Sequence, residues 1–237
     1  MNDFEMKLKD DITVKTVSKA IVNETSKWDF KRADYISLVN DLLDQSLIKS
    51  SKIESKVKTD EKSVPVKRDF PFRGKKIQIR LFDKNSDYKI VQDWLKDYSG
   101  RWFLLSRSSS SDNSMLQIFE DKRNLFGIIS LPDTTPIGLM GFLNYDQNNY
   151  KAEMRKLIGE EIHREKGYAK EASKLWIEYG INNLGLKKIY LNTIENNIRN
   201  VTLNKELGFQ IEGILRKEII INGEYYDVLR MAYIVDD

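Results

Sequence analysis

The feature that most constrains the fold of this chain is a six-residue turn, residues 164–169, between an alternating strand-like run and an amphipathic helical run. Gly167 has no Cβ and lets the backbone approach a ligand closely. The free N–H groups of the helical turn that follows favour an anion at the same place. Arg164 and Lys166 add positive charge there. The sequence therefore predicts a strand, a phosphate-cradling turn and a helix in succession.

Hydrophobic periodicity on both sides of this turn predicts a sheet with helices against it. Turn-forming residues separate the strands of the first half. This order of elements predicts an α+β domain with a mixed, mostly antiparallel central sheet and flanking helices. The serine-rich residues 106–114 are expected to form a loop. Strands are predicted at residues 77–82, 125–130, 136–145, 150–158 and 188–194 and on either side of Asn222-Gly223, and helices at 88–95, 168–179 and 201–206.

The first fifty residues differ in character from the rest of the chain. Apolar residues at helical spacing predict two helices, which we interpret as a small helical appendage over residues 1–50. Residues 51–69 are rich in lysine and serine and are predicted to be a linker. Residues 70–237 are then the main domain. Because about fifty residues rarely bury enough apolar surface to stand alone, the appendage is expected to pack on the main domain, on a second copy in a homodimer, or on a partner protein.

Composition excludes several classes of chemistry. The 237 residues contain no cysteine and one histidine, His163, so a thiol nucleophile and a cysteine- or histidine-rich metal site are excluded and no metal is expected. No apolar run is long enough to cross a bilayer and no secretory signal opens the chain, so we expect a cytoplasmic protein with no membrane partner. Lys plus Arg (39) nearly balances Asp plus Glu (36) along the chain, which disfavours a nucleic-acid partner.

Four segments, in order, carry a resemblance to a known family. They are residues 164–169, Ala152-Glu153 before them, residues 197–209 (Asn-x-x-Asn-Val-x-Leu leading into Glu-Leu-Gly-Phe), and residues 212–228. From about Phe70 to the C-terminus the chain resembles the GNAT superfamily of N-acetyltransferases. The pattern is most similar to the RimJ/RimL branch, whose acceptors include protein N-termini. The last fifty residues also resemble spermidine N-acetyltransferases.

This resemblance implies acetyl-CoA as co-substrate, lying in a gap between two splayed strands with its pantetheine arm extending the sheet. Leu157, Ile158 and Gly159 are implied to bind that arm. Asn197 is implied to hydrogen-bond acetyl-CoA near its thioester, with Asn200 close by. The residues implied to bind the pyrophosphate are Arg164, Glu165, Lys166, Gly167, Tyr168, Ala169 and Lys170.

Two positions depart from the commonest family pattern. Glu165 stands where the turn usually has a first glycine, and Asn204 stands where many members have a tyrosine that protonates the leaving thiolate. Asparagine cannot be that acid. Tyr225 or Tyr226, which alternate across a strand, is a candidate replacement.

The proton that the amine must lose matters more than the one that the thiolate gains. Deprotonating an alkyl amine costs roughly 4.6 kcal/mol at pH 7, whereas about 2 kcal/mol is at stake for the thiol. We therefore hypothesise that Glu153 deprotonates the amine, directly or through a water. The alternative for Glu153 is an ion pair with Arg155 or Lys156.

The sequence leaves two functions from different classes open. The first is an acetyl-CoA-dependent N-acetyltransferase that acts on a primary amine of a small molecule, an amino sugar, an antibiotic or a protein N-terminus. Polyamines are disfavoured because no acidic concentration lies near the expected acceptor side and because of Asn204. The second is a catalytically silent CoA-binding or scaffold module that docks a partner through its helical N-terminal segment.

Overall fold

The computed structural model describes residues 16–31, 34–35, 37–39, 41–42, 69–96, 112–194, 197–221 and 223–235. The chain divides into two compact units, Met1–Thr59 and Asp60–Asp237. In the first unit, residues 16–25 are α-helical, Ser26–Trp28 form the 3-10 helix η1, and the described residues between 34 and 42 are helical as well. Of the predicted linker, residues 51–68 lie outside the described residues.

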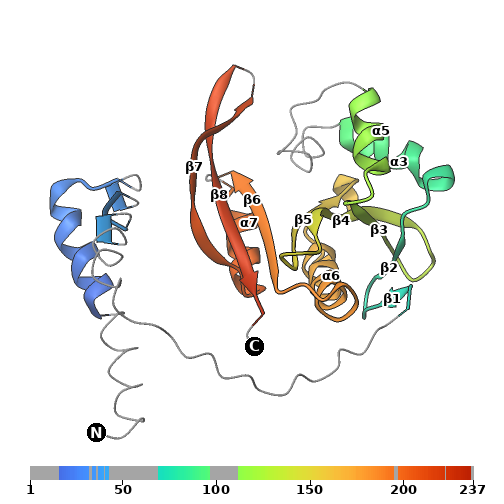
Figure 1. Cartoon of the computed structure of the whole chain (residues 1–237), viewed down its shortest axis with the longest axis horizontal. Coiled ribbons are helices and arrows are strands. Elements are labelled where there is room, and N and C mark those ends of the chain that lie inside the picture. Colours follow the sequence, from blue (N-terminus) through green and yellow to red (C-terminus); the bar gives the residue numbers. More distant parts are fainter. Residues whose placement is uncertain are drawn as a thin grey trace, which may run out of the picture. The chain divides into compact units, whose positions relative to one another are not determined.

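The described part of the second unit forms one eight-stranded sheet in the order β1-β2-β3-β4-β5-β6-β8-β7 (Figure 1). Within that part only the β5–β6 pairing is parallel. The predicted α+β class and mixed sheet are therefore confirmed. The strands are β1 (Phe72–Arg73), β2 (Gln78–Leu81), β3 (Leu125–Ser130), β4 (Pro136–Asp146), β5 (Lys151–Ile158), β6 (Lys188–Ile194), β7 (Gln210–Ile221) and β8 (Glu224–Ile234). The helices are α3 (Lys84–Lys96), α5 (Asp112–Glu120), η3 (Glu161–His163), α6 (Tyr168–Leu184) and α7 (Ile198–Glu206).

Short polar turns fix the meander of β3, β4 and β5. Between β3 and β4, the Asp133 carboxylate accepts a hydrogen bond from the Thr135 amide at 3.0 Å. Between β4 and β5, Asp146 accepts from both the backbone and the side-chain amide of Asn149, at 3.0 and 2.7 Å. An aspartate that binds the backbone two or three residues ahead closes a turn locally, so these turn formers dictate the antiparallel order.

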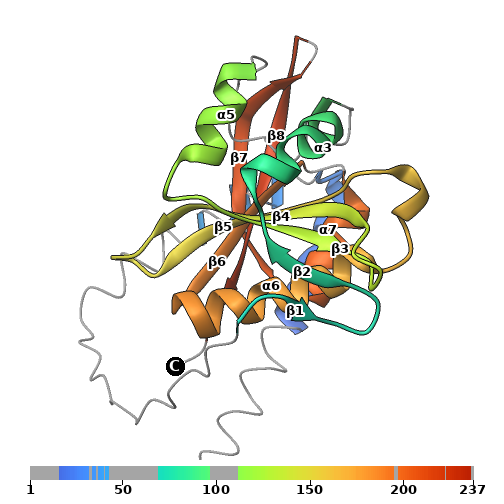
Figure 2. The same cartoon turned by 90° about the vertical axis from the view of Figure 1, so that its right-hand side faces the viewer.

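Helices cover both faces of the sheet. Trp176 of α6 is fully buried and stacks on Phe142 of β4, with ring centroids 5.2 Å apart. Trp94 of α3 packs in a second cluster with Leu139 and Leu143 of the same strand. Figure 2 shows α6 on one side of β3–β5, α3 and α5 on the other, and β6–β8 running at a steep angle to β3–β5. The cores lie on either side of β4, and the two halves of the sheet turn away from each other.

Two elements differ from the sequence prediction. The expected loop at 106–114 is wrong at its end, because α5 begins at Asp112, while residues 106–111 lie outside the described residues. The two-residue strand β1, which pairs Phe72 with Ile79, was not predicted because it is too short to show periodicity. The predicted hairpin near Gly223 is confirmed as β7 and β8, and Gly223 has a left-handed φ of 84°.

Candidate active site

The sheet splits between β5 and β6. These strands pair in parallel through Lys151↔Lys188, Ala152↔Ile189 and Glu153↔Tyr190. Beyond that point β5 continues to Ile158 along β4, and β6 continues to Ile194 along β8, with no pairing between the two. Each strand therefore has one edge with backbone groups available to a ligand.

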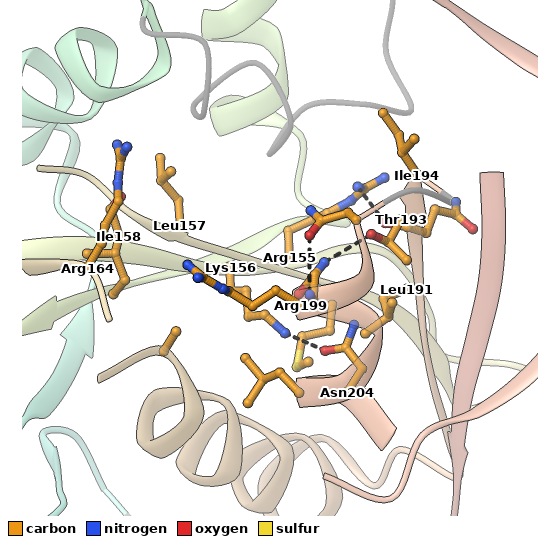
Figure 3. Close-up of a pocket in the computed structure, with 16 residues that line it drawn as sticks. Arg155, Lys156, Leu157, Ile158, Arg164, Leu191, Thr193, Ile194, Arg199 and Asn204 are labelled. Atoms are coloured by element: carbon orange, nitrogen blue, oxygen red, sulfur yellow. Dashed lines mark hydrogen bonds between the residues drawn. The ribbon is translucent and has the colours of Figure 1, made fainter. Parts of the chain in front are cut away.

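A cleft of about 420 Å³ lies in this split, between β5 and β6 and against α7 (Figure 3). Its charged lining residues are all basic: Arg155, Lys156, Arg164 and Arg199. No carboxylate of the described chain is among the lining residues. The residues that line the cleft are Met154, Arg155, Lys156, Leu157, Ile158, Arg164, Ala169, Leu191, Asn192, Thr193, Ile194, Asn197, Arg199, Asn200, Leu203 and Asn204. Such a site favours an extended, anionic ligand.

The cleft brings together only some of the residues implied by the resemblance. The predicted residues that line it are Leu157, Ile158, Arg164, Ala169, Asn197 and Asn200. Those that do not are Glu153, Gly159, Glu165, Lys166, Gly167, Tyr168 and Lys170. Five of these seven residues belong to the turn before α6 or to the first turn of that helix, beside the cleft. The ligand roles of both groups stay predictions.

The turn before α6 adopts the backbone conformation that an anion site needs. Gly167 caps the helix with a φ of 83°, and Glu165 also has a positive φ, 65°. Successive residues of this kind aim backbone N–H groups into one concavity, and the first turn of the helix adds its own. Glu165 turns its carboxylate to Arg199 in an ion pair between exposed side chains. Its charge is therefore partly balanced.

The Arg164 side chain stabilises the end of β5 by hydrogen bonds. Its guanidinium donates to the carbonyl oxygen of Gly159 at 2.7 Å and to that of Ile158 at 3.3 Å. The Gly159 amide donates to Ile137 at 3.0 Å, and a Cβ at position 159 would lie 2.4 Å from the Trp94 ring. Glycine is needed here for packing, and its own N–H is already used within the protein.

Asn197 and Asn200 organise the start of α7. Asn197 is the N-cap, and its side-chain oxygen accepts from the Asn200 amide at 3.2 Å. The Asn200 side chain donates to the Thr193 hydroxyl at 3.1 Å, which ties the helix to β6. An N-cap asparagine is worth about 1 kcal/mol to a helix. Both residues therefore have a structural role at the mouth of the cleft in addition to any contact with a ligand.

Glu153 is buried, with 2% of its surface exposed, at the point where the strands part. Its carboxylate accepts from Arg155 at 2.5 Å and from the Asn192 side chain at 3.2 Å. Asn192 in turn accepts from Arg230 at 3.2 Å. The ion pair with Arg155 that the sequence offered as an alternative is present. The catalytic role stays a prediction.

Lys156 and Asn204 form the contact that the sequence did not reveal. The Lys156 ammonium projects from β5 into the cleft and donates to the side-chain oxygen of Asn204 on α7 (Figure 3). Burial lowers the pKa of Lys156 to about 7. Asn204 is completely buried, and its amide nitrogen has no hydrogen-bond partner within the described chain. Lys156 is one of four charged residues in the eight-residue strand β5, so no local signal distinguished it, and its partner lies 48 residues away.

Neither tyrosine considered as a replacement acid lines the cleft. Tyr225 is 60% exposed, and the Lys217 ammonium lies over its ring. The Tyr226 hydroxyl donates a hydrogen bond to the Glu224 carboxylate at 3.2 Å. Within the described residues, no group of three or more metal-ligating side chains comes together. None of the described helices is long and apolar enough to cross a membrane.

Comparison with known proteins places this geometry in a family. The acetyltransferase (GNAT) domain family model matches residues 77–210. Spermidine N(1)-acetyltransferase of Escherichia coli (strain K12) is 34% identical over 100 residues, 42% of this chain and 53% of that protein. The match thus spans about half the length of that relative. The Bacillus subtilis (strain 168) protein named "Putative ribosomal N-acetyltransferase YdaF" is 25% identical over 162 residues, 65% of this chain and 88% of that protein.

A solved structure has the same fold. The crystal structure of spermidine N-acetyltransferase from Vibrio cholerae in complex with CoA and spermine superposes with a TM-score of 0.60. It is 24% identical, and the match covers 67% of this chain and 95% of that one. The family model spans more than half of the 237 residues and includes β5, the turn, α6, β6 and α7. The chain therefore belongs to the acetyltransferase (GNAT) domain family, with similarity to spermidine N-acetyltransferases.

Proposed function

We propose that this chain is an acetyl-CoA-dependent N-acetyltransferase that moves an acetyl group to a primary amine. The observation that carries the proposal is the split between β5 and β6, where an open strand edge borders a cleft of about 420 Å³. A pantetheine arm contains amides, so it can pair with such an edge as an added strand would. Membership of the acetyltransferase family supports the same ligand.

The residues around the cleft fit acetyl-CoA. Leu157 and Ile158 line the cleft from the open edge and are proposed to bind the arm. The pyrophosphate is proposed to lie on residues 164–170, where two left-handed residues and the helix start supply N–H groups. Asn197 and Asn200 are proposed to contact the arm from α7. The Gly159 N–H donates to Ile137, so Gly159 is proposed to contact the arm through its carbonyl, which also accepts from Arg164 and has a second lone pair.

Glu153 is proposed as the group that takes the amine's proton. It is a carboxylate at the base of the split, next to the lining residue Met154. Because Glu153 does not itself line the cleft, a water molecule must carry the proton. Glu153→Gln is expected to lower kcat most at low pH, with a shifted acid limb. An unchanged pH–rate profile, in a variant that circular dichroism shows to be folded, would assign this role elsewhere.

The proposed acceptor is the amine of a protein N-terminus, as in the RimJ/RimL branch, ahead of an amino sugar or another small amine. The cleft lining of the described chain contains no carboxylate that could bind a second ammonium group of a polyamine. The provisional ribosomal name of the Bacillus subtilis relative supports a peptide acceptor. The name of the Escherichia coli relative supports spermidine, so spermidine belongs in the same test.

Two measurements test this function. Acetyl-CoA is expected to raise the melting temperature, and CoA release is expected with a panel of N-terminal peptides but not with spermidine. Absence of thermal stabilisation would rule out any CoA-dependent function. Stabilisation without turnover on peptides, amino sugars and polyamines would favour the catalytically silent module instead.

We also propose a domain organisation for the whole chain. Residues 1–50 are the helical appendage, 51–69 the linker and 70–237 the catalytic domain, in a cytoplasmic protein. In the first unit, Val17, Val22, Trp28, Val39 and Leu42 each expose about half of their surface or more. Exposed apolar side chains on a helical segment support docking of a second copy or a partner protein.

A further inference from the structure

Lys156 is a cation in the cleft with an uncharged partner. Its ammonium has three N–H donors, and one of them goes to the Asn204 oxygen. No carboxylate of the described chain lies within ion-pair distance of it. A partly buried ammonium with a neutral partner is poorly stabilised as a cation. An anion bound beside Lys156 would therefore stabilise the charged form of this side chain.

The surroundings of Lys156 are cationic or neutral on every side. From its own strand comes Arg155, which is engaged with Glu153, and from the turn comes Arg164. Helix α7 contributes Arg199, which is paired with Glu165, beside the neutral Asn200, Leu203 and Asn204. The lining residues of β6 and α6 are uncharged. The carboxylates of β5 and α7, Glu153 and Glu206, are paired with Arg155 and Lys170 and do not line the cleft, so the anion beside Lys156 is expected to come from a ligand.

The position of Lys156 along the cleft says which part of a ligand it meets. The anion site at the start of α6 lies beyond the end of β5, past Ile158. Lys156 lies midway along the open edge of β5, three residues past Glu153, the last residue of β5 to pair with β6, and two residues before Ile158. An arm that has its phosphates at the turn and follows β5 toward the split therefore passes Lys156. The partner of Lys156 is Asn204, which stands where many family members have the tyrosine that protonates the leaving thiolate, so the reactive end of the arm is expected at this contact.

We propose that Lys156, held in place by Asn204, protonates the sulfur that leaves the thioester. This inference rests on the proposed acetyl transfer. The amine nitrogen forms a bond to the thioester carbonyl carbon, and the carbon–sulfur bond breaks. The sulfur keeps that bond's electron pair and takes a proton from the Lys156 ammonium. The neutral lysine regains a proton from solvent, which also receives the proton lost by the amine.

The proton affinities of the two groups agree with this role. An ordinary thiol has a pKa of about 8.5. With a pKa of about 7, Lys156 is the stronger acid, so the transfer to sulfur is downhill. A tyrosine with a pKa near 10 would transfer the same proton uphill. Lys156 thus takes the place of the tyrosine that many family members have at the position of Asn204.

The first test measures binding and needs no turnover. CoA and desulfo-CoA, which lacks the thiol, are titrated by calorimetry into the wild type, Lys156→Met and Lys151→Met between pH 7 and 8.5, the range between the pKa of Lys156 and that of the thiol. Lys151 lies on the same strand outside the cleft and controls for the substitution. The wild type and Lys151→Met are expected to prefer CoA about tenfold or more, and Lys156→Met to lose that preference while binding desulfo-CoA normally.

A second measurement uses the unmodified lysine side chain. In protein labelled with 13C-lysine, the pKa of Lys156 is followed by NMR through its Cε resonance. CoA is expected to raise it, because a thiolate beside the ammonium favours the charged form, and desulfo-CoA is not. An equal effect of both ligands on the Lys156 resonance would overturn the proposal. If neither ligand binds the wild type, the proposed function fails as well, which is a different result.

Kinetics then test the proton itself. Lys156→Met is expected to lower kcat about 100-fold with little change in the KM for acetyl-CoA. It should also lose the decline of kcat at high pH that follows deprotonation of Lys156. Lys156→Arg keeps the positive charge, but its guanidinium cannot give up a proton. This variant should therefore keep the preference for CoA over desulfo-CoA and lose the wild-type kcat. Wild-type kcat in Lys156→Arg, or stoichiometric acetylation of Lys156 by acetyl-CoA, would overturn the proposal.

Discussion

At the scale of single residues, the charge on Lys156 links the cleft to the stability of the fold. Burial lowers its pKa from 10.5 to about 7, so between these values the unfolded chain binds the proton more tightly than the folded protein does. The free energy of unfolding therefore rises with pH across this window, by at most about 1.4 kcal/mol per pH unit. Below pH 7 the destabilisation is present in full.

Lys156→Met removes this titration. The variant is expected to be more stable than the wild type at pH 6 to 7, and the difference should shrink as the pH is raised toward 10. Because part of the Lys156 side chain stays exposed, the total change should be below the full shift. Urea unfolding across the pH range measures it, with Lys151→Met as control. A difference that is independent of pH would contradict the lowered pKa.

Glu165 is a second residue whose conformation has an energetic cost. A non-glycine residue with a φ of 65° is strained by about 1 kcal/mol, and its carboxylate lies beside the proposed pyrophosphate site. Glu165→Gly should keep or slightly raise stability and tighten CoA binding severalfold. Glu165→Gln separates the causes, because it removes the charge and keeps the strain. Tighter CoA binding by Glu165→Gly alone would show that the backbone conformation causes the effect. Weaker CoA binding by both variants would contradict the expectation.

The residue pairs show how far the sequence alone could reach. The turn at 164–169 was predicted because its glycine and flanking cations are local signals. Alternation along β5 puts Glu153 and Arg155 on one face and Lys156 on the other, so the choice of Arg155 as the partner of Glu153 could have been made from the sequence, whereas the contact with Asn192 of β6 could not. The sequence also could not pair Lys156 with Asn204, since the contact joins a strand to a helix 48 residues later.

At the scale of elements, the end of β5 is held by packing as much as by hydrogen bonds. Gly159 approaches Trp94 of α3 so closely that any Cβ would collide with the ring. Gly159→Ala must therefore shift either α3 or the strand, and it should cost about 1 to 3 kcal/mol. Thermal unfolding measures that loss. The matched change Gly213→Ala, with nothing within 4 Å of its Cβ, should be nearly neutral. Equal losses would contradict the packing argument.

The elements that were predicted are those with local causes. Strands β3 and β4 follow from largely apolar runs, β5 follows from alternation, and their order follows from turns closed by Asp133 and Asp146. The start of α5 at Asp112 was missed because the serines around it have little helix propensity. The split between β5 and β6 was implied by the family resemblance only. Its length, with Glu153 as the last paired residue, is set by the relative angle of two half-sheets and leaves no local signature.

At the scale of the whole molecule, the two units should separate by function. A protein of residues 69–237 contains every residue that lines the cleft, and we expect it to show the same thermal stabilisation by acetyl-CoA as the full chain. The full chain should form particles with more chains each in light scattering, because Trp28 and its apolar neighbours in the first unit are exposed. The same number of chains per particle for the truncated protein and the full chain would contradict a role of residues 1–50 in self-association.

Three residue pairs join β5 to β6 at the base of the split, and this short pairing affects how the protein behaves in storage. A sheet that opens in its middle has two interior edges, Met154–Ile158 and Leu191–Ile194, and both resemble the exposed edge strands through which proteins aggregate. A bound arm that occupies one edge should slow amide hydrogen exchange there and protect the protein from self-addition of strands. The ligand would then take the place of a strand in the sheet. The rate at which the stored protein aggregates would therefore depend on the ligand concentration.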